Sequence, residues 1–370
     1  MQRKTPPVPP EIAALVPYQP GKPIEELERE LGISGAIKLA SNENPLGPSP
    51  KAMAAMAAAI AGLHRYPDGA GFELRQALAR KFGVDFAQTC IGNGSDEIIE
   101  FLARAYIRPG QEALAAAPSF LMYSKLVQVA GGRLTETPLD ADYRVDLEAM
   151  LAAITPATRL VFLNNPDNPA GTAVSRAQLR DFLDRVPEGV LVVLDEAYID
   201  FASDPEVGQG VDFLDHPTPL VVMRTFSKIA GLAGLRIGYA LAPAEVISAF
   251  DRVRQPFNTS ILAQVGGLAA LGDDEFYEET RAQVWRGLED FYRCFAELGL
   301  FYVPSQTNFV LVRIGADAPA VADALLRRGV IVRAMTSYGL PEFLRISVGL
   351  DAENARFSAA LKAILAGGAA

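Results

Sequence analysis

A lysine directly after a hydrophobic run is the first residue with chemical potential. Lys228 lies in RTFSKIAGLAGLRIGY at 224–239, just after the strand-like LVVM. Most lysines are exposed surface residues. A desolvated lysine near another cation, here Arg236, instead loses proton affinity and becomes a nucleophilic amine. Asp195 follows another apolar run, VLVVL, and a carboxylate there is costly unless it meets a cation. A helix cap or a core ion pair would equally explain Asp195.

A glycine-rich turn offers a place for an anion. TCIG at 89–92 runs into GNGSDE, where Gly94 permits a sharp bend and Ser95 and Asp96 begin a helix. The free N–H groups at a helix start, aided by the helix dipole, suit a phosphate. The alternative is that Ser95 or Asp96 is only an N-cap. A dinucleotide site is disfavoured, because Glu97 occupies the position of the third glycine.

Two more polar side chains follow strand-like runs. Asn168 lies in NNPDNPAGT, a loop stiffened by its prolines, and Tyr198 follows Asp195 in DEAY. An anion site, an amide, a carboxylate, a tyrosine and a lysine together match pyridoxal 5'-phosphate. Its phosphate suits the anion site, its aldehyde the lysine, and its pyridinium nitrogen the carboxylate. The combination is far more specific than any single feature.

The elements that would position these residues alternate along the chain. Strands are expected at 89–92, 112–117, 133–139, 159–164, 190–197, 219–226 and 237–242. Helical spacing occupies 95–107, 119–131 and 175–186. This order predicts an α/β fold with a mostly parallel central sheet and helices on both faces. Ligands of such sheets bind at the carboxyl ends of the strands.

A smaller α+β domain is expected after residue 255. One or two long helices are predicted within 259–299, followed by strands at 308–314, 329–335 and 343–350 around a helix at 318–329. The proline-rich first 23 residues are predicted to form an extended arm. The expected division is an arm with part of the small domain (1–40), a large cofactor-binding domain (41–255), and a linking helix with the C-terminal small domain (256–370).

Composition limits the class of protein. The chain has 370 residues, half of them hydrophobic, and a formal net charge of −10, which argues against a nucleic-acid partner. The two cysteines, Cys90 and Cys294, are too few for a zinc site or a disulfide framework, and no metal is expected. No apolar run is long enough for a membrane helix, and prolines interrupt the N-terminus where a signal peptide needs an apolar run. A cytoplasmic protein without a membrane partner is therefore expected.

The motifs resemble the fold-type I pyridoxal-phosphate-dependent aminotransferases, and within them the histidinol-phosphate aminotransferase family, over nearly the whole chain. The matching stretches are VPYQPGKP, LASNENPLGPSP, RYPDG, GNGSDE, NNPDNPAGT, LDEAYIDF, RTFSKIAGLAGLRIGY and FLRISVG. One departure is Ala170, where the family usually has Thr. Because the change lies beside Asn168 and not at it, we expect cofactor binding to survive.

The resemblance implies a role for each cofactor residue. Lys228 would bond covalently to the cofactor aldehyde and later act as the base, Asp195 would pair with the pyridinium nitrogen, and Asn168 and Tyr198 would hydrogen-bond the ring oxygen. Phe120, in APSFLMY, would stack on the ring, although a core aromatic is the alternative. The phosphate would be held by Gly94, Ser95, Asp96, Thr225, Ser227 and Arg236. Tyr66, in RYPDG, would reach the cofactor phosphate of a neighbouring subunit, which implies a homodimer with shared active sites.

The resemblance also implies substrates. Arg345 would clamp a substrate carboxylate, Arg333 would face a substrate phosphate, and Tyr18 and Asn42 would close over the substrate. The implied reaction transfers the amino group of glutamate to imidazole acetol phosphate, which yields histidinol phosphate and 2-oxoglutarate. An aromatic-amino-acid aminotransferase and a pyridoxal-phosphate-dependent decarboxylase share the scaffold and stay open as alternatives. A catalytically silent ligand-sensing module is disfavoured because Lys228 and Asp195 are both present.

Overall fold

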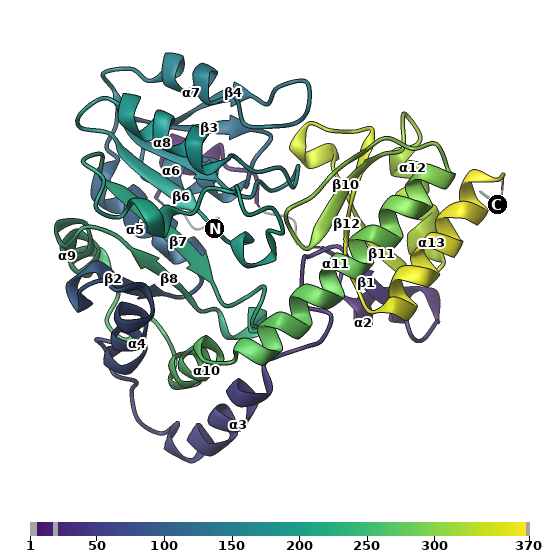
Figure 1. Ribbon diagram of the computed structural model, residues 1–370, viewed down its shortest axis with the longest axis horizontal. Helices are drawn as coiled ribbons and strands as arrows, with labels where there is room; N and C mark the ends of the chain where they lie inside the picture. Colours follow the sequence, from purple (N-terminus) through teal and green to yellow (C-terminus); the bar gives the residue numbers. More distant parts are fainter. Residues whose placement is uncertain (1–5, 18–20, 368–370) are drawn as a thin grey trace, which may run out of the picture.

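Two β-sheets organise the chain. The computed structural model describes residues 6–17 and 21–367. The larger sheet has seven strands in the order β2-β8-β7-β6-β5-β3-β4, and the smaller has five in the order β1-β11-β12-β10-β9. Figure 1 shows each sheet in its own lobe, with the long helix α11 (Asp274–Glu297) running from one lobe to the other.

All seven strands expected between residues 89 and 242 form in the large sheet. They are β2 (Thr89–Gly92), β3 (Glu112–Ala117), β4 (Arg133–Pro138), β5 (Thr158–Asn164), β6 (Leu191–Asp195), β7 (Leu220–Thr225) and β8 (Gly238–Leu241). Strand β8 pairs antiparallel with β2 and with β7, and the other pairings are parallel. The prediction of a mostly parallel sheet is therefore confirmed.

Both faces of the large sheet are buried, which explains its continuous apolar runs. Along β6, Val192 and Leu194 join one core while Leu191 and Val193 join the other, because successive side chains point to opposite faces. The covering helices include α4 (Phe72–Phe82), α5 (Ser95–Tyr106), α6 (Met122–Val129), α7 (Leu147–Ala153), α8 (Arg176–Arg185) and α9 (Ala244–Val253). The residues that follow the carboxyl ends of β5, β6 and β7 thus lie at the edge of a sheet whose two faces are covered.

The small sheet combines both ends of the chain. Its strands are β1 (Ile37–Leu39), β9 (Tyr302–Val303), β10 (Phe309–Arg313), β11 (Val330–Ala334) and β12 (Phe343–Ser347), accompanied by helices α2 (Ile24–Leu31), α12 (Ala318–Arg327) and α13 (Asp351–Leu365). Strand β1 pairs in parallel with β11. The segment expected to be helical at 259–299 forms two helices, α10 (Ile261–Leu271) and α11, and α10 packs against α3 (Pro50–Ala59) and α4 of the large lobe.

The N-terminal segment differs from the extended arm that its prolines predict. Residues Pro10–Ala13 form one helical turn, α1, which lies against α6. Proline is compatible with the first helical position, because its fixed φ suits a helix and its missing N–H would be unbonded there anyway. The extended prediction is therefore wrong for these residues. Among the residues that the structure describes, no helix has both the length and the apolar character needed to cross a membrane.

Candidate active site

A cavity of about 200 Å³ lies at the carboxyl edge of the large sheet. Most of the predicted cofactor residues line it, namely Ser95, Asp96, Phe120, Asn168, Asp195, Tyr198, Thr225, Ser227, Lys228 and Arg236. Ser41, Glu43, Asn164, Ala197 and Ala233 also line it, and sequence reasoning assigned none of these five. Within the described ranges, no three His, Cys, Asp or Glu side chains are grouped so that they could hold a metal ion.

Lys228 follows β7 and presents its amine to this cavity. Its Nζ donates to the Ser41 carbonyl oxygen at 3.3 Å and lies 5.6 Å from the centroid of the Tyr198 ring. Burial lowers the pKa of Lys228 to about 8, and the Arg345 cation acts in the same direction. An appreciable fraction of this amine is therefore neutral near physiological pH, as a nucleophile or base requires.

Asp195 ends β6 as a buried carboxylate with two donors. The Tyr123 hydroxyl donates to its Oδ2 at 2.6 Å, and the Ala197 N–H donates to Oδ1 at 3.2 Å. Burial raises the pKa of Asp195 to about 6, while the hydrogen bond from Tyr123 acts to lower it. Sequence reasoning missed Tyr123, because an aromatic residue on a helix usually belongs to the core. Tyr123 indeed also stacks on Phe162, with ring centroids 4.5 Å apart.

The start of α5 also lines the cavity, through Ser95 and Asp96. Gly94 is the N-cap residue, with φ 78°, so neither Ser95 nor Asp96 serves as the cap and both N–H groups belong to the first turn. The Arg236 Nη2 donates to Asp96 Oδ2 at 3.3 Å. A Cβ atom on Gly94 would lie 2.4 Å from Arg236 Nη2. Glycine at this position therefore lets a guanidinium lie beside a helix N-terminus, an arrangement that suits a phosphate.

Asn168 is held by a neighbour that the sequence analysis did not single out. The Asn168 N–H donates to Asn164 Oδ1 at 2.8 Å, and Asn164 Nδ2 donates to the Asp195 carbonyl oxygen at 2.9 Å. Asn164 ends a buried strand as Asp195 does, and that shared pattern could have identified it. These two bonds connect the Asn168 loop to the end of β6.

Arg345 reaches the same loop from β12 of the small sheet. Its Nη1 donates to Asn168 Oδ1 at 2.5 Å and its Nη2 donates to the Ala40 carbonyl oxygen at 3.0 Å. The guanidinium lies 5.1 Å from the centroid of the Phe309 ring. Its buried Nε has no hydrogen-bond partner among the described residues. Arg345 therefore has a donor left for an incoming acceptor, although it does not line the cavity itself.

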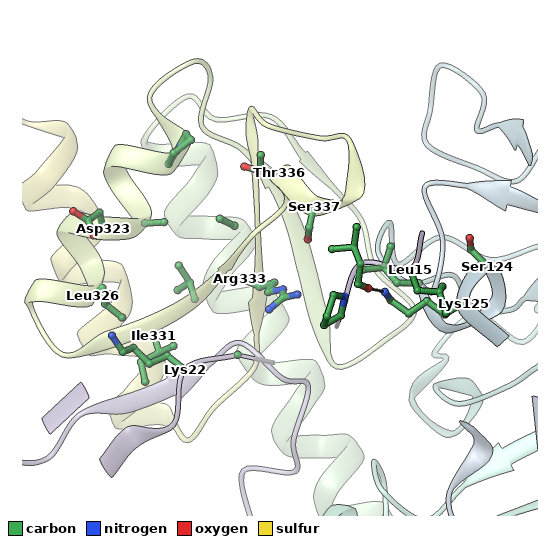
Figure 2. Close-up of a pocket in the computed structure, with 18 of the residues that line it drawn as sticks. Leu15, Lys22, Ser124, Lys125, Asp323, Leu326, Ile331, Arg333, Thr336 and Ser337 are labelled. Atoms are coloured by element: carbon green, nitrogen blue, oxygen red, sulfur yellow. Dashed lines mark hydrogen bonds between the residues drawn. The ribbon is translucent and has the colours of Figure 1, made fainter. Parts of the chain in front are cut away.

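Arg333 lines a second, larger cavity of about 910 Å³. Arg333 lies directly across from Arg345 in the pairing of β11 with β12. Figure 2 shows Arg333 between the small sheet and the N-terminal segment, where Lys125 Nζ donates to the Val16 carbonyl oxygen. Residues 14–17 form part of the cavity wall. Tyr18, the predicted substrate residue that follows them, lies outside the described residues.

Two other predicted residues lie outside the cavity that Lys228 faces. Asn42 is 1% exposed and donates from Nδ2 to the Tyr198 hydroxyl at 2.9 Å. Tyr66 is 81% exposed, and its ring stacks on Phe257 with centroids 4.8 Å apart. The structure thus places Tyr66 on the surface of this chain.

Asp167 is a buried carboxylate behind the Asn168 loop. Its Oδ2 accepts from the Ala170 N–H at 2.9 Å, and its Oδ1 has no partner among the described residues. Burial raises the pKa of Asp167 to about 7. Ala170, the departure from the usual family motif, is fully buried and contributes this N–H group through its backbone.

Comparison with known proteins agrees with this geometry. Residues 34–361 match the model of the family "Aminotransferase class I and II". The chain is 49% identical to the histidinol-phosphate aminotransferase of Akkermansia muciniphila, over 96% of this chain and 97% of that protein. It is also 49% identical to that of an Anaeromyxobacter species, over 97% and 99%. A crystal structure of histidinol-phosphate aminotransferase from Sinorhizobium meliloti in complex with pyridoxal-5'-phosphate superposes with a TM-score of 0.89 at 34% identity, covering 99% of this chain and 98% of that one. The chain therefore belongs to the aminotransferase class I and II family.

Proposed function

We propose that this chain transfers the amino group of glutamate to imidazole acetol phosphate in histidine biosynthesis, and catalyses the reverse reaction, with pyridoxal 5'-phosphate as cofactor. The observation that carries the proposal is the cavity in which the Lys228 amine and the Asp195 carboxylate lie together with the first turn of α5. The relatives named histidinol-phosphate aminotransferase support this choice of substrate.

The residues present fit the cofactor from end to end. The first turn of α5, Ser227 and Arg236 would hold the phosphate, with Gly94 and Thr225 shaping that end. The proposed pairing puts Asp195 against the ring nitrogen, Asn168 and Tyr198 at the ring oxygen, and Phe120 on the ring face. When bound, the cofactor supplies an aldehyde that condenses with amines and a protonated ring that withdraws electrons from the substrate carbon.

Lys228 and Asp195 divide the acid–base work. Lys228, with its pKa lowered to about 8, is proposed to take the proton from the Cα of the amino donor and, in the second half-reaction, to deliver a proton to the corresponding carbon of the amino acceptor. Asp195, with its pKa raised to about 6 by burial, would regain a low pKa opposite a cationic ring nitrogen, because an opposite charge favours the ionised carboxylate. Tyr123 orients Asp195 through its 2.6 Å hydrogen bond. Tyr198 joins Lys228 and Asp195 in the proposed catalytic set.

The two arginines of the small sheet are proposed to distinguish the substrates. Arg345 would bind the α-carboxylate of glutamate, since its buried Nε has no partner among the described residues. Arg333 would bind the phosphate ester, because it lines the larger cavity next to its β12 neighbour. Tyr18 is proposed to close over the substrate from the N-terminal segment. Asn42 is buried and forms hydrogen bonds with Tyr198 and Ser347.

We also propose that the enzyme works as a homodimer. Tyr66 is exposed and stacked on Phe257, and more large apolar side chains are exposed on the same stretch of chain, at Met53, Ile60, Leu63 and Phe72. Contact with a second copy would cover such side chains and bring Tyr66 to the partner's phosphate site. Sedimentation velocity tests the dimer. If Tyr66→Ala lowers the cofactor affinity of a protein that is still dimeric, the shared site is supported.

A cytoplasmic location and a two-domain division complete the proposal. Cys90 and Cys294 are buried and free, as expected in a reducing compartment, and cell fractionation tests this. The proposed domains are the large one at 41–255 and a small one built from 1–40 and 256–370, as the pairing of β1 with β11 supports. Limited proteolysis that releases a stable fragment with other boundaries would contradict this division.

The visible absorbance of the purified protein tests the reaction itself. With bound cofactor, the spectrum should lose its cofactor–lysine band when histidinol phosphate is added at low concentration. Phenylalanine, tested separately, should act only at far higher concentration. A response to phenylalanine alone would replace histidinol phosphate with an aromatic amino acid as the substrate. Release of carbon dioxide would indicate a decarboxylase, and the absence of any band after adding the cofactor would overturn the assignment of Lys228.

A further inference from the structure

A chain of hydrogen bonds runs from the small sheet to the cavity through two residues that do not line it. Ser347, at the end of β12, donates from Oγ to Asn42 Oδ1 at 2.8 Å. Asn42 in turn donates from Nδ2 to the Tyr198 hydroxyl at 2.9 Å. Of the three, only Tyr198 lines the cavity. The chain therefore connects the small lobe to a cavity residue of the large lobe.

The direction of each bond follows from the inventory of donors and acceptors. The backbone N–H of Asn42 donates to Ser347 Oγ at 2.9 Å, so the Ser347 hydroxyl accepts there and its own hydrogen goes to Asn42 Oδ1. With Oδ1 thus occupied, the amide of Asn42 directs Nδ2 towards Tyr198. The Tyr198 oxygen accepts that bond, which leaves its own hydrogen for another acceptor. The hydrogen bond from Asn42 thus leaves the Tyr198 hydroxyl as a donor.

The backbone conformation and the burial of Asn42 also suit an asparagine whose side chain bonds only to protein groups. Asn42 has φ 55°, in the left-handed region that asparagine tolerates better than most residues. Its carbonyl oxygen accepts from Asn308 Nδ2 at 3.1 Å. Asn42 is 1% exposed, so a substrate has little access to its side chain.

We propose that Asn42 and Ser347 are positioning residues that fix the Tyr198 hydroxyl as a hydrogen-bond donor towards the cavity. This inference rests on the proposed function, because the acceptor that it requires is the ring oxygen of pyridoxal phosphate. Asn42 then acts through Tyr198 and does not touch the substrate.

The pH dependence of the visible absorbance of the cofactor-loaded protein tests this inference without measuring turnover. A donor at the ring oxygen stabilises its anionic form, so losing that donor moves the pH midpoint of the spectral change upward. Tyr198→Phe should raise the midpoint by about 1 unit, and Asn42→Gly by about 0.5 unit, since a single hydrogen bond contributes on the order of 1 kcal/mol. Glycine is chosen because it removes the side chain and accepts the positive φ without strain.

Two further variants separate positioning from general stability. Ser347→Ala should move the midpoint in the same direction as Asn42→Gly, and it provides the test if Asn42→Gly fails to fold. Ser305→Ala, a control at another buried serine whose Oγ bonds to Thr307 at 2.7 Å, should leave the midpoint unchanged. In the Tyr198→Phe background, Asn42→Gly should add no further shift, because its effect passes through the Tyr198 hydroxyl.

The outcomes are distinguishable. A normal midpoint in both Asn42→Gly and Ser347→Ala, with a normal wild-type titration, would overturn the positioning role and leave the proposed function intact. If Asn42→Gly shifts the midpoint equally in the wild-type protein and in Tyr198→Phe, the positioning role would also be overturned. A wild-type protein that shows no cofactor band would overturn both the proposed function and this inference.

Discussion

The two sides of the site are built in different ways. On the large-sheet side, Asp195 is held by Tyr123 and Asn168 is held by Asn164, all within one lobe. On the other side, Arg345 reaches the Asn168 loop from the small sheet, and Arg333 faces a larger cavity partly walled by residues 14–17. The first side is fixed by the edge of a rigid sheet. The second depends on how two lobes and a terminal segment meet. We therefore expect the first side to govern cofactor binding and the second to govern substrate choice.

Removing the central amine should have the largest effect. Lys228→Ala should lower turnover by on the order of 10⁴-fold, because one residue supplies both the covalent nucleophile and the base. Cofactor binding should persist through Asp195 and the first turn of α5, which dialysis followed by cofactor assay would measure. Lys51→Ala, at an exposed lysine, is the matched control. Wild-type turnover in Lys228→Ala would remove the basis of the proposed reaction.

Arg333 tests the substrate side. Arg333→Ala should raise KM for histidinol phosphate by about 10- to 100-fold, as loss of a charged hydrogen-bonding partner usually does. KM for glutamate and cofactor affinity should change little. Lys22→Ala is the control, since Lys22 lines the same cavity but pairs with Glu30. Equal losses for both substrates would show that Arg333 does not distinguish them.

Tyr123 tests the large-sheet side. The Tyr123 hydrogen bond lowers the pKa of Asp195, so Tyr123→Phe should raise that pKa. The ionised carboxylate then persists only at higher pH, and the acidic limb of the kcat profile moves upward by about 0.5 to 1 unit. Activity should fall at the acidic end of the profile and recover at higher pH. Tyr106→Phe, at a half-buried tyrosine of α5, should leave the profile unchanged, and an unmoved acidic limb in Tyr123→Phe would contradict the role assigned to this bond.

Weakening the contact between the N-terminal segment and α6 should have a smaller effect on substrate binding. Gln128 Nε2 donates to the Glu11 carbonyl oxygen at 2.7 Å, which helps to hold α1 against α6. Gln128→Ala should raise KM for histidinol phosphate by about 3- to 5-fold, the equivalent of one modest hydrogen bond, with an unchanged spectrum. An altered cofactor spectrum in this variant would mean that the two sides are not separable.

Substitution of Asp167 should change the thermal stability of the protein and not its catalysis. Its pKa in the folded protein is raised to about 7 from 3.8, so the folded state binds more protons than the unfolded state between those values. Stability from this group is therefore present at low pH and lost as pH rises towards 7. Asp167→Asn removes the buried charge and should raise Tm by about 2 to 4 °C at pH 8, with little change at pH 4. A scanning-calorimetry series in which the gain is the same at both pH values would contradict this account.

The sequence predicted the large-sheet side better than the rest. Every expected strand between residues 89 and 242 formed, because runs buried on both faces have a clear pattern and their carboxyl ends share one edge. Tyr123 could not be predicted. Its bond joins residues 72 positions apart, and its spacing matches that of an ordinary core aromatic. Asn42 was expected to face the substrate, but its buried bonds to Ser347 and Tyr198 depend on contact between the two lobes, which no local pattern reports.

The antiparallel pairing of β7 with β8 has a consequence for how the site assembles. Thr225 pairs with Gly238, so the short loop between them carries Ser227, Lys228 and Arg236. The entropy lost on closing a loop grows with its length, and this loop spans only residues 226–237. The contact between Arg345 and Asn168 instead closes 177 residues. A folding chain can therefore form the cationic part of its cofactor site from a local pair of strands, before the contact between Arg345 and Asn168 brings the two lobes together.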